Sequence, residues 1–219
     1  MQRSLLGGGE PEVDAAPSFE RVALDDTSWV DVARGWLRGA DTLLDTLVES
    51  IPWRQGRRRM YERMVDDPRL SAWYGAGDEL PHPALGEIRA ALSCRYAVRF
   101  GSIGVNYYRD GRDSVAWHRD RELKHLDQTL VGIVTLGGPR AFLLRPCGGG
   151  KSRDIRPGPG DLLVMGGRCQ ADWEHSVPKA RSAPPRCSLS LRWSSNAGGS
   201  SAPARAPQRA KRVRPARDA

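Results

Sequence analysis

The chain has 219 residues and a formal net charge of +8. That length allows one domain with a sizeable core and, once the tails are set aside, leaves no room for a second full domain. No stretch reaches the run of about 18 apolar residues that spans a bilayer, and the N-terminus lacks the apolar region of a secretory signal. We therefore expect a soluble protein of the cytoplasm with no membrane partner.

The positive charge is concentrated at one end. Residues 197–219 hold six basic residues against Asp218 alone, a net charge of +5, which leaves +3 for the rest of the chain. Such a tail can bind polyanions loosely through counterion release, or it can be a solvated, disordered end. We expect a disordered basic tail over 197–219 that gives weak support for nucleic acid as a partner.

The four cysteines include no C-x-x-C pair. A chain of this size without a paired cysteine framework does not resemble a small secreted domain. Reduced thiols in a cytoplasm are the simplest interpretation.

The N-terminal third predicts two helices. Residues 1–18 show no period and are expected to be disordered. Apolar residues recur at helical spacing from Trp29 to Val48 and predict a helix that Pro52 ends. Residues 53–77 read as loops and short strands, and residues 83–92 predict a second amphipathic helix.

After Arg95 the pattern changes to short segments rich in β-branched and aromatic residues, separated by Gly and Pro. The expected strands are RYAVRF, SIGVNYY, SVAWHRD, TLVGIVTL, AFLLR, DLLVMG, WEHSV and RCSLSLRW. Many short strands with frequent turn signals indicate an antiparallel barrel or jelly roll. We expect one domain over residues 19–196.

One apparent nucleotide-binding motif is incomplete. GGGKS at residues 148–152 ends like a phosphate-binding P-loop, but Arg145 stands where the first glycine belongs. This segment is better interpreted as a hairpin loop.

A metal site is indicated by His118, Asp120 and His175. His118 and Asp120 are two residues apart at a strand end, so alternation directs both side chains to one face. His175 is the other histidine within an expected strand, WEHSV. Two imidazoles and one carboxylate form a facial triad that suits non-haem iron(II) oxygenases. Because H-x-D also occurs by chance, this interpretation needs independent support.

That support comes from the last expected strand, where four polar residues share one face. This arginine strip consists of Arg186, Ser188, Ser190 and Arg192. Arginine binds carboxylates bidentately, so the strip suits a dicarboxylate lying along the strand, although an edge strand with one solvated face is an alternative. Asn106 and Tyr108 form a similar pair that can bond the same carboxylate, or can be the polar outer face of a strand.

At this point the sequence resembles the AlkB family of nucleic-acid dealkylating dioxygenases. The matching motifs are Asn106-Tyr107-Tyr108 with Arg109-Asp110-Gly111, then His118-Arg119-Asp120 with Glu122, then His175 in WEHSVPK, and last the arginine strip. Weaker similarity extends over about residues 30–195. The strip departs from the family pattern, which often has Asn and Thr where this chain has Ser188 and Ser190.

The resemblance implies an α+β protein, a double-stranded β-helix (jelly roll) with N-terminal helices packed against it. It implies iron(II) held by His118, Asp120 and His175, and 2-oxoglutarate bound by Asn106, Tyr108, Arg186, Ser188, Ser190 and Arg192. It also implies that O2 oxidises 2-oxoglutarate to succinate and CO2 while an N-methyl group on a DNA base is hydroxylated and leaves as formaldehyde. Bases of the 1-methyladenine and 3-methylcytosine type are the expected substrates, and a monomer is expected.

Further residues are candidates for the substrate. Glu122 falls where the family places an acidic residue that reads the exocyclic amine of the damaged base. Trp73, Tyr74 and Trp117 are candidate stacking walls for a flipped base, although each is also a candidate core residue. Arg69, with the arginines at 57–59, is a candidate phosphate contact.

Two other functions stay open. The motifs report the cosubstrate and not the acceptor, so a dioxygenase acting on RNA, protein or a small metabolite is an alternative. A nucleic-acid-binding module without redox chemistry is another, and the complete triad with both arginines argues against it.

Overall fold

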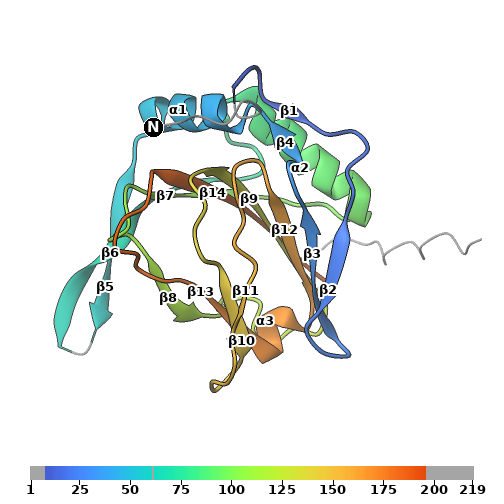
Figure 1. The fold of residues 1–219 in the computed structure, drawn as a ribbon, viewed down its shortest axis with the longest axis vertical. Helices are drawn as coiled ribbons and strands as arrows, with labels where there is room; N and C mark the ends of the chain where they lie inside the picture. Colours follow the sequence, from blue (N-terminus) through green and yellow to red (C-terminus); the bar gives the residue numbers. More distant parts are fainter. Residues whose placement is uncertain (1–7, 61, 196–219) are drawn as a thin grey trace, which may run out of the picture.

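The computed structural model describes residues 8–60 and 62–195, and strands dominate its architecture (Figure 1). In chain order the elements are β1 Glu12–Val13, β2 Glu20–Ala23, β3 Ser28–Ala33, β4 Leu37–Arg38, α1 Ala40–Ser50, β5 Arg54–Met60, β6 Arg63–Tyr74, α2 Pro83–Tyr96, β7 Ile103–Tyr108, β8 Val115–His118, β9 Thr129–Gly137, β10 Leu143–Pro146, β11 Arg153–Asp154, β12 Leu162–Gly167, α3 Cys169–Asp172, β13 Trp173–Val177 and β14 Arg186–Ser194.

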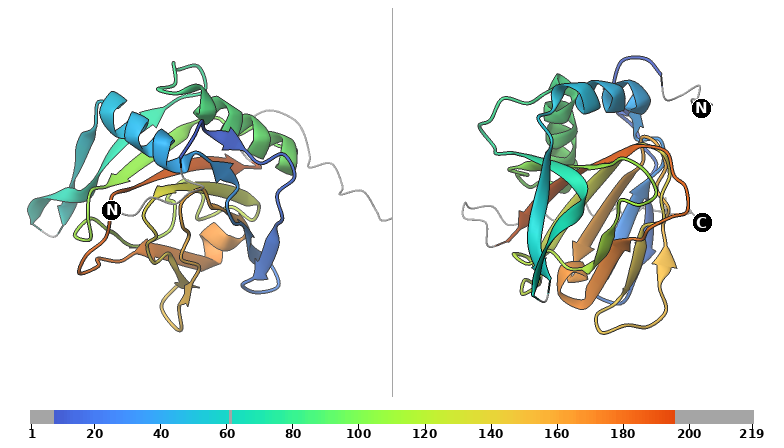
Figure 2. Two further views of the ribbon diagram at one scale, coloured as in Figure 1. Left: turned by 45° about the horizontal axis from the view of Figure 1, so that its top comes forward. Right: turned by 90° about the vertical axis from the view of Figure 1, so that its left-hand side faces the viewer.

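Two antiparallel sheets form the body of the molecule. The large sheet has eight strands in the order β2-β3-β12-β9-β14-β7-β6-β5, and the small sheet has four in the order β11-β10-β13-β8. β1 and β4 form a separate two-stranded pair. The small sheet faces the large one, and α1 and α2 cover the other side of the large sheet (Figure 2). The expected jelly roll with N-terminal helices packed against it is confirmed.

The central strands of the large sheet are buried on both faces. On its outer face Leu43, Leu47, Leu85, Ile88 and Leu92 of the helices pack against strand residues that include Val105, Val134 and Leu189. On its inner face a second cluster joins the two sheets, with members that include Val131, Ile133, Leu144, Leu163 and Trp173. Burial of these apolar side chains stabilises the closed sandwich at roughly 25 cal/mol per Å².

Both helices end where local chemistry requires it. α1 ends at Ser50 because Ile51 takes an extended conformation before Pro52, which confirms the predicted end. α2 begins after His82, whose side chain accepts a hydrogen bond from the Ala84 N–H, and Pro83 occupies its first turn. It ends at Ala97 in the left-handed conformation, with φ at 52°.

Three expectations about the elements are wrong. Residues 28–33 form β3 instead of the start of a helix. Both faces of β3 are covered, so its sequence lacks the alternation of a half-buried strand. RYAVRF is not a strand, because α2 continues through Tyr96. Glu12 and Val13, within the segment expected to be disordered, pair with β4.

The segment at 53–77 forms longer strands than expected. β5 and β6 pair as a hairpin that projects from the body of the molecule at the left of Figure 1. The glycine-rich residues 148–152 connect β10 to its antiparallel partner β11, which confirms a hairpin loop. Residues 1–7 and the expected basic tail at 197–219 lie outside the described residues, and the limits of the domain stay a prediction.

Within the described part of the chain, each helix is too short or too polar to cross a bilayer.

Candidate active site

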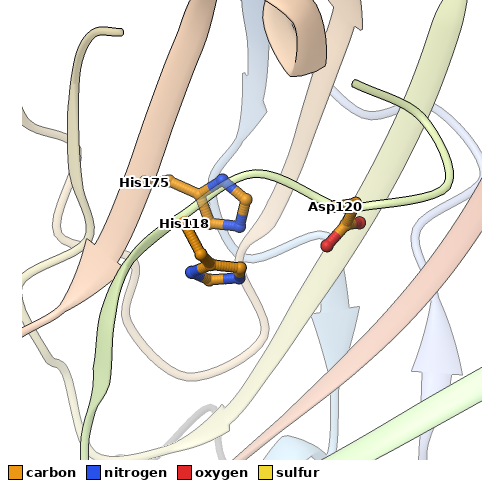
Figure 3. A group of neighbouring side chains, drawn as sticks. All are labelled: His118, Asp120 and His175. Atoms are coloured by element: carbon orange, nitrogen blue, oxygen red, sulfur yellow. The ribbon is translucent and has the colours of Figure 1, made fainter. Parts of the chain in front are cut away.

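The two histidines of the predicted triad lie side by side on neighbouring strands of the small sheet. His118 is the last residue of β8, and it is the register partner of His175 on β13. A β-bulge between His175 and Val177 locally changes the strand direction. Asp120 follows β8, and its carboxylate lies across from the two imidazole rings (Figure 3). One ligand atom from each residue lies within 4.8 Å of the others.

Both imidazoles are set up as neutral ligands. Burial lowers the pKa of His118, and burial together with the neighbouring His118 lowers the pKa of His175 to about 3. The Nδ1 atom of His118 lies 2.9 Å from the Ala116 carbonyl oxygen. When this nitrogen carries the proton and donates it to Ala116, Nε2 presents its lone pair to a metal.

The ring of His175 is held by packing on two sides. Its centroid lies 4.2 Å from that of His118. On another side the ring of Phe142 is stacked at 5.5 Å with an interplanar angle of 25°. This enclosure fixes the plane in which the His175 nitrogens can meet a metal.

Asp120 is kept ionised by Arg192. The Nε atom of Arg192 donates to one carboxylate oxygen at 2.6 Å, and its Nη2 atom lies 3.4 Å from the other. Burial alone would raise the pKa of Asp120, but the hydrogen bond and charge of Arg192 outweigh it, so that pKa is lowered. The backbone N–H of Asp120 donates to the side chain of Gln170, which anchors the loop after β8.

The arginine strip faces the triad from the large sheet. In the register of the sheet, Ser188 lies between Asn106 of β7 and Thr135 of β9. Ser190 lies between Gly104 and Ile133. The strip and its neighbours therefore line the interior of the sandwich, which excludes the alternative of a solvated edge strand.

Arg186 is the most informative member of the strip. It is 1% exposed, and its Nε and Nη1 atoms have no hydrogen-bond partner among the described residues. Its Nη2 atom reaches only the hydroxyl of Thr135, at 3.4 Å. Burial lowers the pKa of this guanidinium. A buried cation with unused donors is costly, so this position is built to receive an anion.

A second arginine orients Asn106. The Nε atom of Arg69 donates to Oδ1 of Asn106 at 3.0 Å. With its carbonyl oxygen occupied in this way, the amide N–H groups of Asn106 can donate to a bound carboxylate. Tyr108 is buried, and the Arg186 guanidinium lies 5.5 Å from the centre of its ring.

All of these groups surround one cavity of about 90 Å³, called the metal cavity below. Its lining residues are Arg69, Asn106, Tyr108, Val115, His118, Asp120, Val131, Ile133, Phe142, His175, Val177, Arg186, Ser188, Ser190 and Arg192. Polar and apolar side chains share this lining. The set of ligand atoms suits iron(II), and the unused donors of Arg186 suit one carboxylate of 2-oxoglutarate.

A larger and more open space, called the Trp73 groove below, adjoins the metal cavity. It measures about 520 Å³ and is lined by Pro52, Arg54, Ser71, Ala72, Trp73, Tyr74, Gly104, Asn106, Ser190 and Arg192. Asn106, Ser190 and Arg192 line both spaces. The groove therefore shares a wall with the metal cavity, and two of the predicted aromatic residues stand in it.

Two predicted substrate residues lie elsewhere. Glu122 is exposed, and it is absent from the lining of both spaces as the described residues define them. Trp117 precedes His118 on β8 and therefore faces the opposite side of the strand. The Arg145 guanidinium lies 4.0 Å from the centre of the Trp117 ring. Trp117 therefore packs against Arg145 and does not form the expected stacking wall for a flipped base.

Sequence reasoning missed several residues around the site. Phe142 stacks on His175, Gln170 holds the loop of Asp120, and Gly104 forms part of the groove. Phe142 is the only one for which a signal existed, since it lies in the expected strand AFLLR. The contacts of Gln170 and Gly104 depend on how the two sheets pack, which no local pattern reports.

Known proteins resemble this chain over most of its length. Residues 77–213 match the model of the 2OG-Fe(II) oxygenase superfamily. Mouse alpha-ketoglutarate-dependent dioxygenase alkB homolog 3 is 32% identical over 71% of this chain and 62% of its own length. The human protein of the same name is 32% identical over 84% of this chain and 70% of its own. The DNA oxidative demethylase ALKBH2 of Arabidopsis thaliana is 28% identical, over 86% and 74%.

The match to the mouse relative thus spans less than two thirds of that protein's length. Among solved structures, a prolyl hydroxylase from Trichoplax adhaerens, in complex with a hypoxia inducible factor peptide, superposes with a TM-score of 0.54. It is 15% identical, and the match covers 74% of this chain and 82% of that one. This similarity supports the double-stranded β-helix fold. With the triad and the arginine strip in place, the chain belongs to the AlkB homologue family within the 2OG-Fe(II) oxygenase superfamily.

Proposed function

We propose that this protein removes alkyl groups from N-alkylated bases in DNA, of the 1-methyladenine and 3-methylcytosine type. Its relatives are named as an alpha-ketoglutarate-dependent dioxygenase and as a DNA oxidative demethylase. The metal cavity supports the oxidation in this proposal, and the adjoining Trp73 groove supports a nucleobase as the substrate.

The observation that carries the proposal is the buried guanidinium of Arg186. Two of its nitrogen atoms are without partners among the described residues, and it lines the same cavity as the triad. A free buried cation beside three metal-ligating side chains is explained by a cosubstrate that presents a carboxylate to the arginine. 2-oxoglutarate carries a second carboxylate and a keto group that suit a metal.

The oxidation uses both atoms of O2. One atom enters succinate as 2-oxoglutarate loses CO2, and the other is inserted into a C–H bond of the N-methyl group. The resulting N-hydroxymethyl group then loses formaldehyde: the C–N bond breaks, the ring nitrogen keeps its electron pair, and the proton of the hydroxyl passes to solvent. His118, Asp120 and His175 would hold iron(II), which would supply the redox chemistry for this oxidation.

The chain's own residues bind, orient and exclude water. Arg186, Asn106 and Tyr108 would hold the far carboxylate of 2-oxoglutarate, with Ser188 and Ser190 beside it. Arg192 keeps Asp120 ionised and fixes its direction. Val131, Ile133 and Phe142 also line the cavity, and their apolar side chains would limit the access of bulk water to the reacting atoms.

Access requires the base to leave a duplex or to come from a single strand. Trp73 offers aromatic surface for such a base, and Arg69 offers charge at the metal cavity. Tyr74 also borders the groove, but it follows Trp73 on β6 and packs against the core on the helix side of the sheet, so it is not the stacking surface. A role of Glu122 in reading the base stays part of this proposal and depends on movement of its exposed loop. We also propose that the protein acts as a monomer. The four free cysteines are consistent with a reducing compartment such as the cytoplasm.

The test measures formaldehyde and succinate released from a single-stranded oligonucleotide carrying one 1-methyladenine or 3-methylcytosine. The reaction contains iron(II), ascorbate and 2-oxoglutarate, and compares the wild type with His118→Ala and His125→Ala. His125 lies in an exposed loop, so its variant is the matched control. We expect equal amounts of both products from the wild type and the control, and none from His118→Ala.

A methylated RNA strand, a peptide and free nucleosides form the comparison arms. Succinate without formaldehyde from every nucleic-acid substrate would contradict dealkylation while leaving the dioxygenase chemistry. Faster release from RNA than from DNA would change the polymer in the proposal and retain the chemistry.

A further inference from the structure

Trp73 is a large aromatic residue that the fold leaves open to solvent. Its side chain is 57% exposed, although it lies on β6 within the large sheet, next to the active site. Its ring stands 5.7 Å from the guanidinium of Arg192, which in turn bonds the metal ligand Asp120. An exposed indole this close to a metal site presents a flat face to the groove.

Gly104 lies directly beneath that indole. It is the register partner of Trp73 on one side and of Ser190 on the other. A Cβ atom placed on Gly104 would lie 3.1 Å from Cε3 and from Cζ3 of Trp73, and 3.1 Å from the Ser190 hydroxyl. These contacts are tighter than most Cβ contacts, so a methyl group on residue 104 would require the indole to move by a few tenths of an ångström.

The backbone gives no reason for glycine at this position. Gly104 is absent from the residues with positive φ, so any L-residue can adopt its conformation. Glycine inside a strand destabilises it relative to alanine. Such a glycine commonly marks a close approach of another group to the backbone. The close approach here is that of the indole of Trp73.

We propose that Gly104 is a positioning residue, which holds Trp73 low in the groove so that the exposed face of its indole receives the planar ring of a nucleobase. The inference rests on the proposed function, because it assigns the Trp73 groove to the base. Without the side chain of residue 104, the groove stays open up to Asn106, Ser190 and Arg192, the wall that it shares with the metal cavity.

The charge of the groove agrees with a nucleotide. Arg54 and Arg192 line it, and no carboxylate is among its described lining residues. A cationic groove with one aromatic platform is the arrangement that binds single strands through phosphate contacts and stacking. A purely structural role for the pair, in which the indole covers a glycine to stabilise the sheet, predicts an effect on stability without an effect on base binding.

The experiment uses the full chain with Mn(II) and 2-oxoglutarate under anaerobic conditions. Binding of a fluorescein-labelled single strand with one 1-methyladenine is followed by anisotropy for the wild type, Gly104→Ala, Gly104→Val, Trp73→Phe and Gly132→Ala. Gly132 lies on β9 in the same sheet, and a Cβ there would meet Leu92 of α2 on the outer face, so it is the matched control. Thermal unfolding and the dissociation constant for 2-oxoglutarate are measured for each variant.

We expect Gly104→Val to weaken binding of the methylated strand about tenfold, the range of one stacked base. Gly104→Ala should fall between it and the wild type, and Trp73→Phe should keep most of the binding. The affinity for 2-oxoglutarate should stay within about twofold of the wild-type value, because Gly104 and Trp73 do not touch Arg186. Gly132→Ala should change only the thermal midpoint.

Wild-type binding by both Gly104 variants would overturn the inference, as would a parallel loss of 2-oxoglutarate affinity, which would indicate distortion of β7 at Asn106. If the wild type releases formaldehyde from the same strand, either result rejects only the role of Gly104 in positioning Trp73, and the proposed function stands. A wild type that neither prefers the methylated strand nor releases formaldehyde rejects the proposed function as well.

Discussion

At the scale of single residues, the active site is marked by a charge without a partner. Arg186 is buried in a strand, and its nearest described hydrogen-bond acceptor is one hydroxyl. Arg140, which is also buried, shows the ordinary arrangement, since it donates to the backbone carbonyls of Asp110, Asp113 and Pro178. Arg140 thus holds backbone segments together, whereas Arg186 keeps donors that a bound ligand can use.

Replacing Arg186 with methionine should have opposite effects on stability and on binding. The apolar side chain removes an uncompensated buried cation, so the ligand-free protein should become more resistant to thermal unfolding. Affinity for 2-oxoglutarate should fall at least about 30-fold, the consequence of losing a buried charged partner. Calorimetric titration with Mn(II) present measures the second effect. Arg145→Met, on the outer side of β10, is the control and should leave 2-oxoglutarate affinity unchanged; equal losses in both variants would contradict the assignment.

The sequence was sufficient to identify most of these residues. H-x-D at a strand end and alternation along the last strand depend only on the two-residue period of a β-strand, and the structure brings both sets into one cavity. The interpretation of Glu122 came from the family pattern, and that of Trp117 from the need for an aromatic wall against a flipped base. The two-residue period of a β-strand by itself predicts that Trp117 faces away from His118, so the sequence was enough to correct that interpretation.

At the scale of elements, short apolar segments bounded by Gly and Pro were predicted correctly even where both faces are buried, as in β9 and β12. α2 and the strands from β7 onward have clear periods or short bounded runs. β3 is covered on both faces, so its apolar residues matched a helical template as well as a strand. The hairpin of β5 and β6 was predicted as loops and short strands because its polar and basic sequence carries little hydrophobic pattern.

The turn between β2 and β3 connects the large sheet to the small one through Asp25. Its carboxylate accepts hydrogen bonds from the Trp173 indole at 2.5 Å and from the backbone N–H groups of Thr27 and Ser28 at 2.8 Å. Burial acts to raise the pKa of Asp25, but these donors outweigh it and lower the pKa to about 2. The folded state therefore favours the ionised form.

Asp25→Asn should consequently destabilise the protein in a pH-dependent way. The folded pKa is below the unfolded value of about 3.9, so the stabilisation is present above about pH 4 and is lost as pH falls toward 2. We expect a loss of about 1 kcal/mol in the free energy of unfolding at pH 7. Urea unfolding of the wild type and the variant at several pH values measures it. A difference that stays constant down to pH 3 would contradict the role of the charge.

At the scale of the whole molecule, the active site belongs to neither sheet alone. The small sheet supplies both histidines, and the large sheet supplies the arginines and Asn106. A metal and a dicarboxylate bound between the two sheets should therefore link them and stabilise the sandwich. The fold itself was predictable as a jelly roll, whereas the facing of particular residues across the interior was not, because it depends on tertiary packing.

Removal of the metal should lower the thermal midpoint of the entire domain. A ligand that binds only the native state stabilises it by about 2.7 kcal/mol at one hundred times its dissociation constant. We expect Mn(II) and 2-oxoglutarate together to raise the midpoint more than either alone, and EDTA to reverse the shift. Scanning fluorimetry measures this, and the same shift in His175→Ala would show that the ligands bind elsewhere.

The pairing of His118 with His175 also limits how this sequence can change over evolution. Because the two meet only through strand register, deletion of one residue within β13 would turn His175 to the opposite face while keeping the composition of the strand. The loop at 148–152 lies outside that register: a Cβ on Gly148 or Gly149 would meet nothing within 4 Å, and one on Gly150 would make an ordinary contact with Pro146. A change of length in that loop should therefore leave the two histidines aligned, while β13 must keep its length.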